Sequence, residues 1–214
     1  MGWVGAELPA AVSNAGGCGM VTAGSHAQAD GLDGLRALVR ECKRLTDKPF
    51  GVNFLLLNSA EDFNATADLV IEEGVPVVET AGRPPPPDLL AKLHAAGVTV
   101  IHKCVTVRHA LAAEKAGVDA VEVAGFDLCG HPGEKDLGNW IMFAKAGRVL
   151  RIPWIAAGGC GDGSQLAAAL AFGACGVNMV RSTPPPPQAA CRQLTLCLLR
   201  TGYSVHGDER LPNR

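Results

Sequence analysis

Short apolar runs alternate with amphipathic segments along most of the chain. Leu35, Leu38, Val39 and Cys42 hold helical spacing, and a strand-like run at 50–56 follows them. The same order then recurs, and glycines 74, 97 and 117, which stand 23 and 20 residues apart, each close a helical stretch before the next apolar run. Strands that alternate with helices at this spacing indicate a parallel sheet in an α/β protein.

Seven apolar runs qualify as strands. They lie at 11–15, 50–56, 75–81, 98–104, 119–125, 153–158 and 176–181. A closed (β/α)₈ barrel needs eight strands, so the pattern predicts a TIM-type barrel that is incomplete. The open edges at 11–15 and 176–181 would then favour self-association.

Composition narrows the class of protein. The chain has 214 residues, of which 48% are hydrophobic and 19% charged, and a formal net charge of −2. This charge gives no electrostatic reason to expect nucleic acid or an anionic membrane as a partner. No apolar run reaches the roughly 18 residues of a spanning helix.

The cysteines argue against disulfides and against a metal centre. All eight are scattered singly, without a CxxC pair, which favours a reducing cytosol as the location. His102 and Cys104 share one face of a strand, but no second pair of ligands accompanies them, so we expect no metal.

Candidate chemistry lies where strands end. The loop after the run at 119–125 holds His131 between glycines, and histidine suits proton transfer near neutral pH. Gly158 and Gly159 follow another strand, and Gly-rich turns before a helix bind phosphate well. Three further candidates also lie at the ends of predicted strands. They are the segment 13–19, Asn53 and Lys103. A phosphorylated cofactor is therefore expected.

Each of these features also has a purely structural reading. His131 can cap backbone groups in its turn, and each glycine pair can serve turn geometry alone. The two PPPP runs, at 84–87 and 184–187, are best explained as stiff loops.

Several motifs together resemble the nitronate monooxygenase family, formerly 2-nitropropane dioxygenase, which includes NAD(P)H:quinone reductases. The motifs are VSNAGGCG, FGVNF, VIHKCVTVRHALAAEKAGVDAV, GFDLCGHPGE and IAAGGCGDGSQLAAALAFGACGVNM. The resemblance covers about residues 1–183 and implies a TIM barrel that binds FMN without metal. It further implies oxidation of alkyl nitronates by O₂, or hydride transfer from a nicotinamide nucleotide to a quinone.

The resemblance also implies roles for individual residues. His131 matches the base that abstracts a proton in nitronate-oxidising members. The positions that match cofactor-binding residues are Met1, Gly2, Asn53, Lys103, Ala124, Cys129, Gly158, Gly159, Cys160, Val180 and Arg181. Lys103 would stabilise negative charge near the flavin ring, and Gly158–Cys160 would hold the phosphate.

The sequence departs from the family pattern at several points. Val180 replaces a glycine and Arg181 a threonine in the second half of the phosphate site, and Ala124 stands where an acid is common. The run that contains Cys129 and His131 is closer to the variety associated with quinone reductases. Met1 matches the end of the first barrel strand, so the chain is expected to be truncated.

The resulting expectation has two parts. Residues 1–183 form an FMN-binding barrel that acts as an oxidoreductase, and residues 184–214 add a helix near Gln188–Arg200 and a polar tail. The alternatives are a quinone reductase of the same family and a truncated, non-catalytic remnant.

Overall fold

A computed structural model of the protein describes residues 5–23, 31–56, 63–128, 136–179 and 197–198. Strands and helices alternate through these ranges. The strands are β1 (Gly19–Thr22), β2 (Phe50–Leu56), β3 (Val77–Gly82), β4 (Thr99–Cys104), β5 (Ala120–Ala124), β6 (Trp154–Ala157), β7 (Gly176–Asn178) and β8 (Cys197–Leu198). The helices are α1 (Glu7–Asn14), α3 (Gly31–Leu45), α4 (Phe63–Glu72), α5 (Pro87–Ala95), α6 (Val107–Ala116), α7 (Asn139–Val149) and α8 (Gly163–Ala171).

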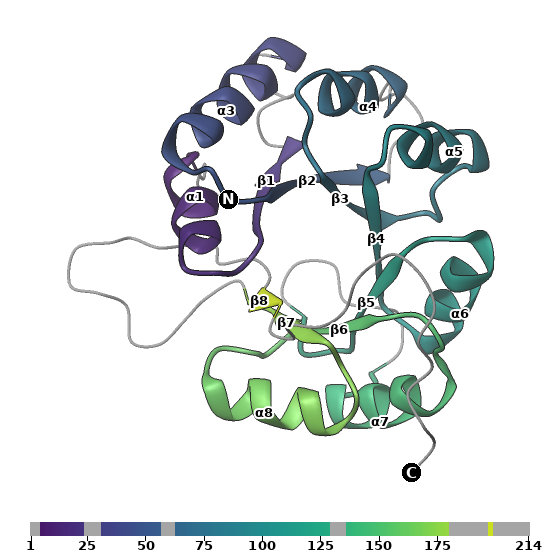
Figure 1. Ribbon diagram of the computed structural model, residues 1–214. Helices are drawn as coiled ribbons and strands as arrows, with labels where there is room; N and C mark the ends of the chain where they lie inside the picture. The colour runs from purple at the N-terminus through teal and green to yellow at the C-terminus, as the bar shows by residue number, and fades with distance from the viewer. Residues whose placement is uncertain (1–4, 24–30, 57–62, 129–135, 180–196, 199–214) are drawn as a thin grey trace.

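The sheet has the curvature of a barrel. Its strands pair in sequence order from β1 to β8, parallel as far as β7, and β8 pairs with β7 in the antiparallel sense. The helices lie around the outer side of the curved sheet (Figure 1). Parallel strands with crossover helices build this layered arrangement. The predicted α/β fold, an incomplete TIM-type barrel, is confirmed.

The prediction of a strand at 11–15 is wrong. These residues belong mostly to α1, and the first described strand is β1, five residues further on from Asn14. A short apolar run does not distinguish a strand from a helix by periodicity. Glu7 lies in the first turn of α1, and Pro9 lies early enough that its missing NH does not interrupt the helix.

This correction moves the loop at 13–19 to the other end of the barrel. The loop precedes β1, whereas the candidate residues Asn53 and Lys103 lie near the carboxyl ends of their strands. The Ser13 hydroxyl accepts a hydrogen bond from the Gly19 NH at 3.1 Å, and the Asn14 side chain donates to the Leu45 carbonyl. The loop therefore joins α1 to the base of the sheet.

The edges of the sheet also differ from the prediction. Within the described residues β1, not 11–15, forms one edge, and it pairs only with β2. The outer side of β7 is partly covered, because Gly176 and Val177 pair with β8. A helix was expected near Gln188–Arg200, but the two residues described in that range form a strand.

Apolar side chains fill two regions. The larger region lies between the sheet and the helices and includes Val52, Val100 and Val121 from the strands and Leu35 and Val39 from α3. The smaller region contains Cys18, Met20, Ile101 and Ile155. Successive strand residues point to opposite faces, which places this second cluster inside the barrel. In the described part of the chain, no helix is long and apolar enough to cross a membrane.

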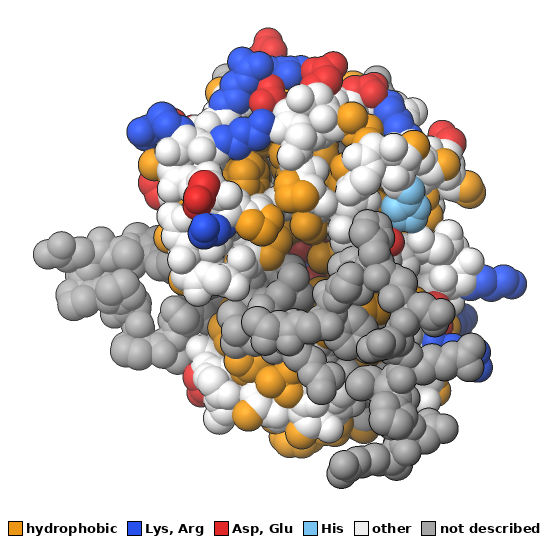
Figure 2. All heavy atoms as spheres, in the orientation of Figure 1, with side chains coloured by type: hydrophobic (Ala, Val, Ile, Leu, Met, Phe, Trp, Pro, Cys, Tyr) orange, Lys and Arg blue, Asp and Glu red, His pale blue; other side chains and the backbone are white. Residues whose placement is uncertain are grey.

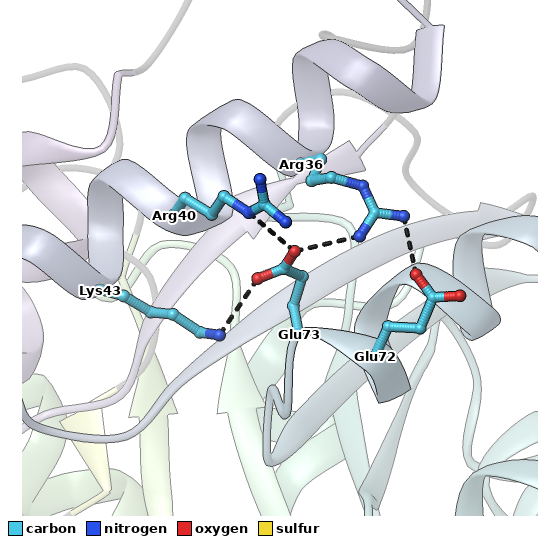
Figure 3. A network of polar contacts seen from close by, with 5 residues as sticks. All are labelled: Arg36, Arg40, Lys43, Glu72 and Glu73. Atoms are coloured by element: carbon cyan, nitrogen blue, oxygen red, sulfur yellow. Dashed lines mark hydrogen bonds and ion pairs between the residues drawn. The ribbon is translucent and has the colours of Figure 1, made fainter.

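A charged cluster joins α3 to the end of α4. Glu73 accepts hydrogen bonds from Arg36, Arg40 and Lys43 at 2.9–3.2 Å, and Arg36 also bonds to Glu72 at 2.8 Å (Figure 3). Acidic and basic side chains crowd the surface above these two helices (Figure 2). Only 8% of the Glu73 side chain is exposed, against 59% for Glu72. Glu73 is therefore the anchor of this contact.

We predict that Glu73→Gln destabilises the protein by about 1–2 kcal/mol, because three charge-assisted hydrogen bonds are weakened. Burial alone would raise the pKa of Glu73, but the hydrogen bonds from the three cations outweigh it and lower the pKa. A carboxyl whose pKa is lowered by folding contributes stability that is lost as the pH falls through the folded-state value. Urea unfolding at neutral and acidic pH measures both effects.

The matched control is Glu72→Gln, which removes a single contact of an exposed side chain. Exposed ion pairs contribute roughly 0–1 kcal/mol, so this variant should stay close to the wild type. Equal losses of unfolding free energy in the two variants would contradict the role of Glu73 as the anchor.

A second prediction concerns Gly19. A Cβ placed there would overlap the carbonyl of Pro9, so α1 packs directly on the backbone of β1. Gly19→Ala should cost about 1–3 kcal/mol by overpacking. Gly163→Ala is the control, since a Cβ at this position meets nothing within 4 Å. If the thermal unfolding temperature of Gly19→Ala is no lower than that of the control, the contact is refuted.

Candidate functional site

A layer of polar side chains lies inside the barrel above the apolar cluster. It comes from five strands, β2, β3, β4, β5 and β7, and consists of Asn53, Glu79, Lys103, Glu122 and Asn178. The register brings these positions together, since Asn53 pairs with Glu79 in the β2–β3 ladder and Lys103 pairs with Glu122 in the β4–β5 ladder. Side chains at paired positions lie on the same face of a sheet, so one polar layer forms.

Lys103 is the centre of this layer. Its Nζ atom lies 2.8 Å from Glu79 Oε1 and 3.0 Å from Glu122 Oε1. Asn53 Nδ2 donates a second hydrogen bond to Glu79 Oε1 at 3.0 Å, and Asn178 Nδ2 donates to Glu122 Oε2 at 2.7 Å. Both carboxylates are buried, whereas 21% of the lysine side chain is exposed. The lysine thus connects a buried acidic pair to open space.

The layer sets the protonation of its members. Burial would lower the pKa of Lys103, but Glu122 and Glu79 outweigh it and raise the pKa well above the ordinary value. Burial raises the pKa of Glu122, Glu79 adds to this rise, and Lys103 and Asn178 oppose it. Lys103 is therefore charged, and the burial of Glu122 favours its protonated form.

A cavity of about 410 Å³ opens beside this layer. Asn53 and Lys103 line it, together with residues from the ends of β3 and β4 such as Ala81 and Cys104. Its volume falls within the range of ligand-binding pockets, roughly 300–1,000 Å³. In barrels of this type the carboxyl ends of the strands carry the active site, and this cavity lies at that end.

Two histidines also line this cavity, His102 and His109. His102 Nδ1 lies 2.8 Å from the Thr80 hydroxyl, and burial lowers the pKa of His102 to about 4. A neutral, hydrogen-bonded imidazole of this kind has a structural role. Among the described residues, no group of three or more His, Cys, Asp and Glu side chains could hold a metal ion.

The Gly158–Gly159 turn forms the second part of the candidate site. Both glycines have positive φ, 85° and 66°. A Cβ at Gly158 would lie 2.9 Å from the Leu128 NH nitrogen, so the loop after β5 packs against this turn. Cys160 follows, half-buried, with its thiol 3.6 Å from the Gly158 carbonyl. Glycine is therefore required by backbone conformation and by packing alike.

Asn139, the first residue of α7, holds the two loops together. Its Oδ1 accepts a hydrogen bond from the Gly125 NH at 2.7 Å, and its Nδ2 donates to the carbonyls of Ala157 and Gly158. It joins the end of β5 to the end of β6. The position of the glycine turn thus depends on a side chain 19 residues before Gly158 in the sequence.

The start of α8 is occupied by its own side chains. The Asp162 carboxylate accepts from the NH groups of Ser164 and Gln165, and Gln165 Oε1 accepts from those of Gly161 and Asp162. This reciprocal arrangement is a capping box. No hydrogen bond within the described part of the chain engages the NH groups of Gly159 and Cys160. These two groups are the donors left for an anion.

The structure brings together only part of the predicted site. Asn53 and Lys103 share the first cavity, whereas Gly158, Gly159 and Cys160 line a smaller one of about 160 Å³. The loop at 125–128 separates the two cavities, since Leu128 lines the first and Asp127 the second. Ala124 is buried at the end of β5. The predicted residues outside the described ranges are Met1, Gly2, Cys129, His131, Val180 and Arg181.

Sequence reasoning missed Glu79, Glu122, Asn178 and Asn139. A signal existed for the first two, because an acid within VVETA or AVEVA interrupts a run that is otherwise apolar. Acids in such runs are buried and need a partner. Asn178 and Asn139 had no such signal, since an asparagine at a strand end or a helix start is ordinary.

Comparisons with known proteins agree with the fold. The family described as nitronate monooxygenase matches residues 1–182. In solved structures, the chain is similar to FabK from Thermotoga maritima, with a TM-score of 0.73 and 37% identity over 85% of this chain and 55% of that one. It is also similar to nitroalkane oxidase from Streptomyces ansochromogenes, with a TM-score of 0.73 and 28% identity over 81% of this chain and 60% of that one.

Two curated relatives give the sequence comparison. The chain is 41% identical over 180 residues to "(3aS,4S,5R,7aS)-5-hydroxy-7a-methyl-1-oxo-octahydro-1H-indene-4-carboxyl-CoA dehydrogenase" of Rhodococcus jostii, over 84% of this chain and 48% of the relative. It is 32% identical to nitronate monooxygenase of Paraburkholderia phytofirmans, over 78% of this chain and 56% of the relative. The chain thus spans about half the length of these relatives. With the family match extending over residues 1–182, the chain belongs to the nitronate monooxygenase family.

Proposed function

We propose that the protein is an FMN-dependent oxidoreductase that oxidises alkyl nitronates with O₂. The observation that carries this proposal is the cavity at the carboxyl end of the barrel, lined by Lys103 and Asn53, in a chain of the nitronate monooxygenase family. The relatives named nitronate monooxygenase and nitroalkane oxidase support the substrate class.

The residues present fit the two ends of a flavin nucleotide separately, in two cavities on either side of the loop at 125–128. The first cavity has a suitable volume. In the polar layer beside it, though not among the lining residues of the cavity, Asn178 Oδ1 is a buried acceptor without a hydrogen-bond partner among the described residues. An acceptor of this kind suits a ligand that carries NH donors. Lys103 and Asn53 would hold the ring side of FMN, and the NH groups of Gly159 and Cys160 would hold its phosphate. Bound FMN would supply a two-electron acceptor that returns to its oxidised state with O₂.

The fit has one restriction. Because the Asp162 and Gln165 side chains occupy the start of α8, the phosphate would bind beside the Gly158–Cys160 turn and not on the helix end itself. Asp162 is exposed and negatively charged, so a phosphate must keep its distance from it. The remaining phosphate contacts would come from Val180 and Arg181.

His131 is assigned the role of base. A neutral histidine that faces the substrate can take a proton from the carbon next to the nitro group, which is the step that a nitroalkane needs before oxidation. Lys103 would hold negative charge next to the ring, and the apolar lining of the cavity from Leu55, Ala81 and Val105 would exclude water.

A second candidate is the oxidation of a coenzyme A ester. It is favoured by the relatives named carboxyl-CoA dehydrogenase, which are 41% and 42% identical to this chain, more than the 32% of the nitronate monooxygenase. Quinone reduction with NAD(P)H is the third outcome to be tested. We further propose a cytosolic location, supported by the free cysteines 18, 42, 104, 160 and 175.

The test is direct. The purified chain is examined for flavin absorbance, and O₂ consumption is then measured with an alkyl nitronate, with NAD(P)H and a quinone in place of the nitronate, and with an acyl-CoA ester. Flavin together with nitronate-dependent O₂ uptake is the expected result. A colourless protein that gains no absorbance or activity when FMN is added contradicts the proposal.

We predict that His131→Asn retains FMN and lowers turnover of the neutral nitroalkane by about 10²–10⁴-fold, since it removes the general base that takes the proton from the carbon next to the nitro group. His94→Asn is the control, because His94 lies on the surface in α5, paired with Asp119. Turnover that is unchanged in His131→Asn, with flavin still bound, would exclude the base and would favour hydride transfer to a quinone.

We also predict that Gly158→Ala loses FMN. The added Cβ would lie 2.9 Å from the Leu128 nitrogen at a φ of +85°, and would displace the phosphate turn. Gly173→Ala is the matched control, because Gly173 has a similar φ of +96° but open space around the new Cβ. Both variants should lose some stability through backbone strain, but only the first should lose flavin. Equal FMN content in the two variants refutes the location of the phosphate.

A further inference from the structure

The cation that lines the main cavity is already neutralised. Lys103 Nζ contacts one oxygen of Glu79 and one of Glu122, at 2.8 and 3.0 Å. With both carboxylates ionised, the three residues carry a net charge of −1. An additional anion beside Lys103 would then meet two carboxylates and only one ammonium, so the lysine in this state has little attraction left for it.

One added proton would change this balance, and the geometry favours Glu122 as its site. Glu79 Oε1 accepts a hydrogen bond from Asn53 at 3.0 Å and lies 2.8 Å from Lys103 Nζ. Glu122 Oε1 makes no hydrogen bond in the described part of the chain beyond its ion-pair contact with Lys103, and the side chain is wholly buried. Glu122 has as many donors as Glu79, namely Lys103 and one asparagine. Its Oε1 atom, however, lacks a hydrogen bond in a wholly buried carboxylate, so the charge on Glu122 is the less well stabilised one.

The side-chain amide of Asn178 can form a hydrogen bond with either the ionised or the protonated carboxyl group of Glu122. In the structure its Nδ2 donates to Glu122 Oε2 at 2.7 Å, which suits the ionised carboxylate. Its Oδ1 is buried and has no hydrogen-bond partner among the described residues. A half-turn of the amide exchanges the two atoms, and Oδ1 then accepts from a protonated Glu122. The neighbour of Glu122 is thus compatible with the uptake of a proton.

We propose that negative charge placed beside Lys103 in the cavity is accompanied by the uptake of one proton at Glu122. The charge has two possible sources, a small planar anion bound in the cavity or a flavin ring that gains electrons there. The proton comes from solvent and remains on the Glu122 carboxyl, which leaves Lys103 paired with Glu79 and with the new charge. The flavin source, and the nitronate as the natural anion, rest on the proposed function.

Other titratable groups face Glu122, but they do not compete for this proton. Lys103 and Cys104 come from β4, Glu79 from β3 and Cys160 from the turn after β6. Burial raises the pKa of Cys104 to about 12 and also raises that of Cys160, so both thiols stay neutral. Burial raises the pKa of Glu122 towards the neutral range. The two thiols therefore do not compete with Glu122 for the proton.

The first experiment measures the binding of nitrate to the FMN-free chain by calorimetry, from about pH 5.5 to about pH 9. Nitrate is a planar anion that does not titrate in this range and is not oxidised. Wild-type affinity should fall by about tenfold per pH unit above the pKa of Glu122, which corresponds to one proton. Heats measured in two buffers of different ionisation enthalpy should count that proton.

Variants test the assignment to Glu122. Glu122→Gln should bind nitrate with an affinity independent of pH, Glu122→Asp should keep a pH dependence, and Lys103→Met should not bind nitrate. Glu72→Gln, on the surface, should behave as the wild type. Nitrate binding that is independent of pH in the wild type, equally dependent on pH in Glu122→Gln, or undetectable at every pH would overturn the proposal.

The second experiment tests the flavin as the source of the charge. The midpoint potential of bound FMN is titrated with dithionite as reductant at several pH values. The wild-type potential should fall more steeply with pH than that of Glu122→Gln, by about 30 mV per pH unit, which is one proton for two electrons. Equal slopes exclude the flavin as the source. Nitrate binding linked to pH in a chain without nitronate turnover would refute only the proposed function.

Discussion

The ion pairs of Lys103 with Glu79 and Glu122 are the constraint on which the barrel depends at the carboxyl ends of its strands. They place three charges from β3, β4 and β5 in the interior, where an unpaired charge is not tolerated. Removing one partner of a buried pair costs roughly 3–5 kcal/mol, because the other charge is left uncompensated. Asn53 and Asn178 extend the same network to β2 and β7, so five strands must keep their register for these polar groups to be satisfied.

Much of the fold was predictable from the sequence, because it depends on patterns that repeat. Six of the seven predicted strands correspond to β2–β7, and the glycines 74, 97 and 117 that close the helical stretches all have positive φ. The run at 11–15 failed because it is too short for its periodicity to separate helix from strand. What decides between them is the packing of α1 on Gly19, which no local pattern records.

The candidate site was predictable to a smaller extent. Asn53 and Lys103 lie where expected, at one cavity, and the glycine turn at 158–159 has the conformation that its sequence indicates. The acids that neutralise Lys103 were missed, although they determine what the lysine can bind. Each of them is separated from Lys103 by about one strand and one helix in sequence, and such contacts follow from strand register and not from spacing.

The polar layer also bears on how the barrel assembles. Neighbouring strands in the sheet are neighbours in sequence, so partial sheets can form from any two consecutive units. A fragment that contains β3 without β4, or β5 without β4, would bury a carboxylate with no cation. Intermediates that stop at such points are therefore penalised, whereas a sheet that already includes β3, β4 and β5 places Lys103 against both carboxylates. The buried charges, which add little to stability once paired, would make the central strands fold as a unit.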